Sequence, residues 1–189
     1  MSDYYDHHPR LVLSRPVVLA GELGCGAAAI GHHVSSRSGI SFAEVDRLIE
    51  HEAGSALARL AFEIGPHGVA ARATATLERL VRQPARKIVA LGSAWPDERA
   101  LGLLRDHTHV VHVRRPNAYL LQRLAAEALR SGDWILDGLA LPLRSEADLK
   151  PLHERRAPLL GEASIVVDAG GRDESRVAGL VLEAFDHLT

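Results

Sequence analysis

The sequence lacks the marks of a secreted or membrane protein. Cys25 is the single cysteine, so it has no partner for a disulfide within the chain. The N-terminal segment MSDYYDHHPR has neither the apolar core nor the cleavage site of a secretory signal. No stretch approaches the ~20 consecutive apolar residues that span a bilayer. These absences predict a cytoplasmic protein without a membrane segment.

The sequence also lacks any block of like charge. Its 22 basic and 24 acidic residues give a net charge of −2, and both signs are spread along the chain. Proteins that bind nucleic acid or an anionic membrane usually gather basic residues on one segment or face. Eleven histidines are scattered without a recurrent spacing of metal ligands. We therefore expect no nucleic acid, no membrane and no metal site.

What is present fits one compact domain. The chain has 189 residues, of which 47% are hydrophobic, and it shows no internal repeat. Residues 1–14 are polar and uneven, which predicts a flexible N-terminal extension. The folded domain is expected to comprise residues 15–189.

Short apolar runs alternate with helical patterns along this domain. The runs that predict buried strands are 16–20, 41–45, 87–91, 109–113 and 164–167. The segments that predict helices are 27–36, 46–54, 70–81, 96–105, 117–130, 146–160 and 175–188, with an irregular stretch at 133–145. This alternation predicts a three-layer α/β fold with a five-stranded parallel sheet between helices.

A glycine-rich loop follows the first predicted strand. Residues 21–26 read GELGCG and match the first six positions of the phosphate-binding P-loop pattern G-x-x-x-x-G-K-[ST]. Backbone N–H groups in such a loop converge on phosphate, helped by the positive end of the helix that follows. Ala27 and Ala28 stand where the pattern has lysine and a Mg²⁺-binding hydroxyl. A tight strand-to-helix turn alone would also explain Gly21, Gly24 and Gly26.

From about Pro16 to the C-terminus, the chain resembles the shikimate kinases. Residues 42–50 (FAEVDRLIE) resemble the family's D-x-D-x-x-I-E segment, 110–113 (VVHV) resemble its V-V-Y-L strand, and 154–159 (ERRAPL) resemble its R-x-P-L-Y helix. The resemblance implies the P-loop kinase fold. In an active member it also implies ATP and Mg²⁺ as cofactors and shikimate as the phosphoryl acceptor.

The resemblance also implies roles for individual residues. Asp46 matches an aspartate that binds substrate hydroxyls, and Arg156 matches an arginine that binds the substrate carboxylate. Gly92 begins the segment that replaces a triple glycine lining the shikimate pocket. The substrate-binding candidates are therefore Asp46, Arg156 and Gly92. The nucleotide-binding candidates are Gly21, Gly24, Cys25, Gly26, Ala27, Ala28 and Arg123, the last of which falls beside the family's adenine-stacking arginine.

The departures from the family fall on residues that carry chemistry. Ala27, Ala28, Ala70 and Leu141 stand where the resemblance implies the loop lysine, the Mg²⁺ hydroxyl, a second substrate arginine and the lid arginine. These departures predict an inactive family member without catalytic residues, which acts as a ligand-binding or regulatory module. Its partner would be a small anionic ligand or another protein.

Two other functions stay open from the sequence alone. The first is an active ATP-dependent kinase for shikimate or a related hydroxy acid, in which Arg123 or Arg144 supplies the missing positive charge. The second is a structural partner that stabilises a true enzyme. Two local alternatives also remain, because Asp46 could cap the helix that follows it and Arg156 could lie on a solvated helix face.

Overall fold

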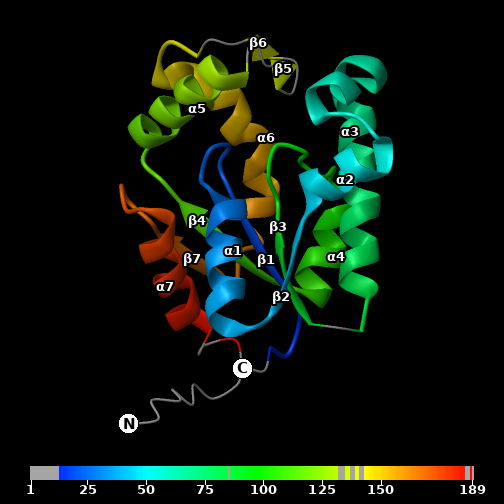
Figure 1. The fold of residues 1–189 in the computed structure, drawn as a ribbon, viewed down its shortest axis with the longest axis vertical. Coiled ribbons are helices and arrows are strands. Elements are labelled where there is room, and N and C mark those ends of the chain that lie inside the picture. The colour runs from blue at the N-terminus through cyan, green and yellow to red at the C-terminus, as the bar shows by residue number, and fades with distance from the viewer. Residues whose placement is uncertain are drawn as a thin grey trace, which may run out of the picture.

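A computed structural model describes residues 13–84, 86–131, 135–136, 139–140, 143–185 and 188 (Figure 1). The predicted N-terminal extension lies almost wholly outside these residues, and so does Leu141, at the position of the lid arginine. Helices cover both faces of a central sheet, which confirms the predicted α/β class.

Five parallel strands form the sheet in the order β2-β3-β1-β4-β7. Their bounds are β1 Val17–Gly21, β2 Ser41–Glu44, β3 Lys87–Ala90, β4 His109–Arg114 and β7 Ile165–Asp168, each within one residue of its prediction. β1 lies at the centre, where Val18 pairs with Val89 of β3 on one side and Val110 of β4 on the other. Every residue of β1 is buried, which explains why this strand is wholly apolar.

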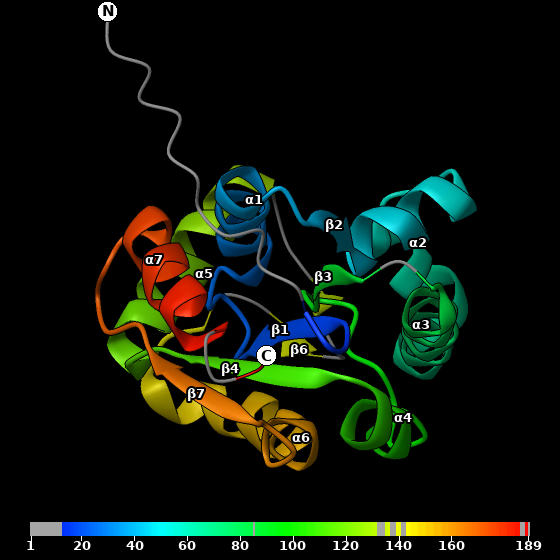
Figure 2. The same cartoon turned by 90° about the horizontal axis from the view of Figure 1, so that it is seen from below.

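The helices occupy both sides of this sheet. Figure 2 shows α1 and α7 on one face and α4 and α6 on the other. The helices are α1 Ala27–Ser38, α2 Val45–Ala53, α3 Leu57–Arg82, α4 Ala100–His107, α5 Asn117–Ser131, α6 Lys150–Leu160 and α7 Glu174–Phe185. A 3₁₀ turn, η1 Glu146–Leu149, precedes α6, and the short strands β5 Ile135–Leu136 and β6 Leu139–Ala140 pair antiparallel.

Alternate side chains of β1 enter two separate cores. Val17 and Leu19 pack with residues of α1, α5 and α7, whereas Val18 and Ala20 pack with residues of α3, α4 and α6. Successive side chains of a strand point to opposite faces, so a strand that is apolar at every position requires cover on both sides. In the part of the chain that the structure describes, no helix is long and apolar enough to cross a membrane.

Three predicted helices differ from those observed. The helix predicted at 70–81 is the second part of α3, which begins at Leu57 and is interrupted at Gly65, where φ is 72°. Pro66 then opens the second segment, a position at which proline is tolerated. The helix predicted at 96–105 begins only at Ala100, and the one predicted at 146–160 divides into η1 and α6.

Candidate functional site

The glycine loop joins the end of β1 to the start of α1. Gly24 and Gly26 have positive φ angles of 87° and 88°, which favour glycine. A side chain at position 21 is excluded because its Cβ would lie 2.5 Å from the backbone oxygen of Val113 in β4. The turn itself therefore requires all three glycines. It also places the N-terminus of α1 at the carboxyl end of β1, where backbone N–H groups favour anions.

Ala27 and Ala28 form the start of α1, directly after the loop. Both residues line a cavity, and Ala27 is buried in the core beneath it. A methyl group carries no charge and binds no metal. The start of α1 therefore contributes only backbone groups and apolar surface to the cavity.

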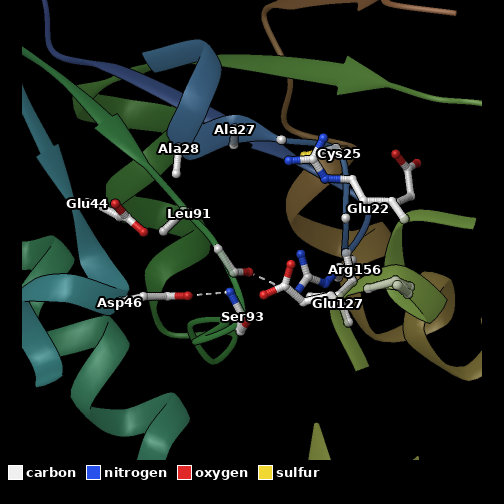
Figure 3. A pocket seen from close by; sticks show the side chains of 16 residues that line it. Glu22, Cys25, Ala27, Ala28, Glu44, Asp46, Leu91, Ser93, Glu127 and Arg156 are labelled. Carbon is white, nitrogen blue, oxygen red and sulfur yellow. Dashed lines mark hydrogen bonds between the residues drawn. The ribbon is translucent and has the colours of Figure 1, made fainter. Parts of the chain in front are cut away.

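The cavity has a volume of about 270 Å³ and lies between the glycine loop, the start of α2 and the turn after β3 (Figure 3). Gly21 lies at the end of β1 and is not part of the lining. Ligands of open parallel sheets bind at the carboxyl ends of the strands, and this cavity lies at those ends. The predicted site residues that it brings together are Gly24, Cys25, Gly26, Ala27, Ala28, Asp46, Gly92, Arg123 and Arg156.

Asp46 lies in the first turn of α2, and its carboxylate is held by the turn after β3. Oδ2 accepts a hydrogen bond from the backbone N–H of Ser93 at 2.7 Å, and Oδ1 accepts one from Ala94 at 3.0 Å. Burial raises the pKa of Asp46, although these two N–H groups and Arg156 oppose the rise. A Cβ at Gly92 would lie 2.4 Å from Oδ2, so a side chain there would displace the carboxylate or the turn.

The hydrogen bonds of Asp46 bear on the alternative that it caps α2. The N-cap residue of α2 is Glu44, and the structure has no side-chain cap at this helix start. Both carboxylate oxygens of Asp46 are directed instead to residues 93 and 94. Asp46 is therefore a residue of the cavity wall and not a helix cap.

Arg156 lines the cavity and links the end of β1 to the turn after β3. Its Nη1 donates to the backbone oxygen of Gly21 at 3.0 Å, and its Nη2 donates to that of Gly92 at 2.9 Å. The guanidinium carbon lies 4.2 Å from the centre of the Trp95 ring, a cation–π contact. Only 1% of the residue is exposed, so Arg156 does not lie on a solvated helix face.

Ala70, at the position of the second substrate arginine, is outside the lining of this cavity. It is buried and lines a second cavity together with Trp95, the residue that stacks on Arg156. The cavity retains one of the two arginines that the family resemblance implies for a carboxylate.

Arg123 projects from α5 and forms an ion pair with Glu174, the first residue of α7. Its Nη1 also donates to the hydroxyl of Tyr119 at 3.2 Å. Burial alone would raise the pKa of Glu174, but the backbone N–H at the start of α7 and Arg123 lower it overall. The positive charge of Arg123 is thus already matched by a carboxylate of this chain.

Several residues in and around the site, Glu22 among them, were not predicted from the sequence. Glu22, inside the glycine loop, lies with Oε1 3.1 Å and Oε2 3.3 Å from Nε2 of His112 in β4. Burial would raise the pKa of Glu22, but the hydrogen bond with His112 and other favourable contacts lower it overall. The signal in the sequence is an acidic residue inside a loop that usually receives anions.

Arg115 connects the loop to the turn before α7. Its Nε donates to the backbone oxygen of Cys25 at 3.3 Å, and its Nη1 donates to those of Gly170 at 3.1 Å and Arg172. Only 4% of Arg115 is exposed. Burial raises the pKa of the Cys25 thiol, which disfavours the reactive thiolate. Arg115 therefore has a structural role at the loop.

The charges that line the cavity are mainly negative. Carboxylates outnumber guanidinium groups four to two, with Glu22, Glu44, Asp46 and Glu127 against Arg123 and Arg156. Two of these carboxylates disfavour each other's charge. Burial raises the pKa of Glu44, and the nearby charge of Asp46 raises it further. Among the residues that the structure describes, no group of three or more histidine, cysteine or acidic side chains could hold a metal ion.

Comparisons with known proteins agree with this architecture. The family model for shikimate kinase matches residues 23–186. Shikimate kinase 2 of Enterobacter sp. (strain 638) is 28% identical over 169 residues, which cover 89% of this chain and 95% of that protein. A shikimate kinase of Marinomonas sp. (strain MWYL1) is 28% identical over 175 residues, which cover 89% of this chain and 90% of that protein.

The solved structures agree in fold. A shikimate kinase from Acinetobacter baumannii in complex with shikimate has a TM-score of 0.76 at 22% identity, over 92% of this chain and 93% of that one. One from Aquifex aeolicus has a TM-score of 0.70 at 19% identity, over 91% and 96%. Because the family model covers most of the sequence, the chain belongs to the shikimate kinase family.

Proposed function

We propose that this chain is a shikimate-kinase-like binding protein, which holds a small hydroxylated ligand at Asp46 and does not transfer a phosphoryl group to it. The observation that carries the proposal is the pair Ala27 and Ala28 at the start of α1, after a fully formed glycine loop. P-loop enzymes use a lysine and a hydroxyl residue here to hold the transferred phosphate and Mg²⁺.

The cavity residues do not fit a complex of Mg²⁺ with a nucleoside triphosphate. Ala28 offers no oxygen to the metal, and Ala27 offers no charge to the phosphates. The lining carries more carboxylates than arginines, which repels a polyanion. Loss of one donor that stabilises developing charge typically costs ~10²–10³ in rate, and here several positions are affected together.

Asp46 supports binding of a ligand with hydroxyl groups. Each of its carboxylate oxygens accepts one backbone hydrogen bond, and a carboxylate has about four acceptor sites in all. The remaining acceptor sites can therefore receive hydroxyl protons from a ligand in the cavity. A carboxylate on the same ligand would have to compete with the backbone oxygens of Gly21 and Gly92 for Arg156.

An active kinase is the second candidate. The observation that favours it is that relatives matching about nine-tenths of this chain are named shikimate kinases. Under this candidate, Arg123 would supply the charge that Ala27 lacks. The ion pair of Arg123 with Glu174 must then break before the guanidinium can reach a phosphate.

Calorimetric titration tests the binding part of the proposal. We expect shikimate, a small trihydroxy acid, to bind, and Asp46→Asn to weaken it about tenfold or more through loss of a charged acceptor. Asp106→Asn, at an exposed position outside the cavity, is the matched control. ATP should bind weakly, with the same affinity with and without Mg²⁺. Tight ATP binding that requires Mg²⁺ would contradict the proposal and favour the second candidate.

A further inference from the structure

The carboxylate of Glu174 lies against the last glycine of the loop. A Cβ placed on Gly26 would be 3.3 Å from Cγ and Oε1 of Glu174 and 3.8 Å from Nη1 of Arg123. Gly26 is the residue directly before α1, so this ion pair sits at the start of that helix. The N-terminus of a helix and the N–H groups of a glycine loop form a region that attracts anions.

Contacts on both sides of Glu174 fix its position relative to the loop. Arg115 links the backbone oxygen of Cys25 to those of Gly170 and Arg172, in the turn that leads into α7. One residue after Glu174, Ser175 accepts a hydrogen bond from Arg37 of α1 at 2.6 Å. The start of α7 is thereby held to both the loop and α1.

The same surroundings keep Glu174 ionised. It opens α7, and Arg123 pairs with it, so its pKa is lowered even though burial opposes ionisation. Asp173 already caps the start of α7, because its Oδ1 accepts a hydrogen bond from the backbone N–H of Arg176 at 2.9 Å. Glu174 is therefore not needed as a cap. A fixed negative charge thus stands where a phosphate group would need positive surroundings.

We propose that Glu174 acts as an internal anion, which neutralises Arg123 and keeps polyphosphates away from the glycine loop. The inference rests on the proposed function, in which the cavity binds a ligand without phosphoryl transfer, and it adds that this ligand lacks a polyphosphate group. Glu174 is a specificity-determining residue in this account. Its removal exposes both the loop N–H groups and the guanidinium of Arg123 to an incoming anion.

Calorimetric titration with inorganic tripolyphosphate tests this role in the full chain. Glu174→Gln keeps the size of the side chain and removes its charge, and it should bind tripolyphosphate at least about tenfold more tightly than the wild type. The matched control is Glu183→Gln, the same change at an exposed position of the same helix, which should bind like the wild type. The double variant Glu174→Gln/Arg123→Gln should lose most of the gain, because only the loop N–H groups then remain to attract the anion.

The outcomes separate this inference from the proposed function. If folded Glu174→Gln binds tripolyphosphate no better than Glu183→Gln, or if the wild type already binds it as tightly as Glu174→Gln, the role of Glu174 is refuted. Phosphoryl transfer by the wild type would instead refute the proposed function. Should Glu174→Gln fail to fold, Glu174→Ser removes the same charge at a helix start that tolerates serine, and the same comparison decides.

Discussion

At the scale of single residues, Arg156 links the end of β1 to the turn after β3. Arg156→Ala would remove hydrogen bonds to Gly21 and Gly92 and the contact with Trp95. We expect the free energy of unfolding to fall by about 1.5–3 kcal/mol, the scale of a hydrogen bond from a charged donor. Urea denaturation measures this loss.

The control for Arg156 is an exposed arginine. Arg59 pairs with Glu63 at the surface, with 77% of its side chain exposed, so Arg59→Ala should change stability little. If Arg156→Ala is as stable as Arg59→Ala, the guanidinium does not hold the strand ends together. Arg156 would then be available to a ligand, as the family resemblance implies.

Glu22 should make the stability of the folded chain depend on pH. Its pKa is lower in the folded chain than its ordinary value of 4.5, so its charge contributes stability above that pH. This contribution is lost as the pH falls through the lower folded value. Glu22→Gln should therefore unfold more readily than the wild type at neutral pH, and the difference should shrink below pH 4.5.

Thermal unfolding at a series of pH values measures the effect of Glu22. Glu183→Gln, which changes an exposed glutamate of α7, provides the comparison. A difference between Glu22→Gln and the wild type that grows as the pH falls below 4.5 would contradict the assigned role of Glu22.

At the scale of elements, the turn after β3 depends on Gly92. A methyl group at Gly92 would lie 2.4 Å from Oδ2 of Asp46, so Gly92→Ala must displace that carboxylate or the turn. We expect a loss of about 1–3 kcal/mol in stability and weaker ligand binding. Gly102→Ala in α4 meets nothing within 4 Å and should gain ~0.4–1 kcal/mol. Equal melting temperatures for the two variants would contradict this account of the turn.

Elements were predictable from the sequence where one local pattern determined them. β1 and β3 are short runs buried on both faces, and the bounds of all five strands of the sheet were predicted closely. The first segment of α3 was missed, because Gly65 and Pro66 together are typical of a break in a helix. The structure shows that helix continues on both sides of this break.

The contacts of the site were less predictable, because they join residues far apart in the chain. Arg123 and Glu174 are 51 positions apart, and Glu22 and His112 are 90 positions apart. No periodicity within a segment reveals such pairs. The family resemblance placed Asp46 and Arg156 at one cavity, but it gave no sign that Arg156 donates to backbone oxygens.

At the scale of the whole molecule, the chain has the fold of its family, and Ala27 and Ala28 follow the glycine loop. The sheet order and the position of the loop at the centre of the sheet are those that the P-loop kinase resemblance implies. The residues on which the proposed function rests lie at the start of α1, at the start of α7 and around Arg156. We therefore expect a protein that folds stably and binds a ligand in the cavity at the glycine loop.

The central claim is that this cavity binds without transferring phosphate, and a coupled assay with ATP, Mg²⁺ and shikimate tests it most directly. We expect no turnover above the buffer control by the wild type. Ala27→Lys alone should not restore it, because Ala28 and Glu174 still oppose binding of the Mg²⁺–nucleotide complex. An active shikimate kinase assayed in parallel verifies the conditions. Wild-type turnover in the range of about 1–100 s⁻¹ that is usual for kinases would contradict the account.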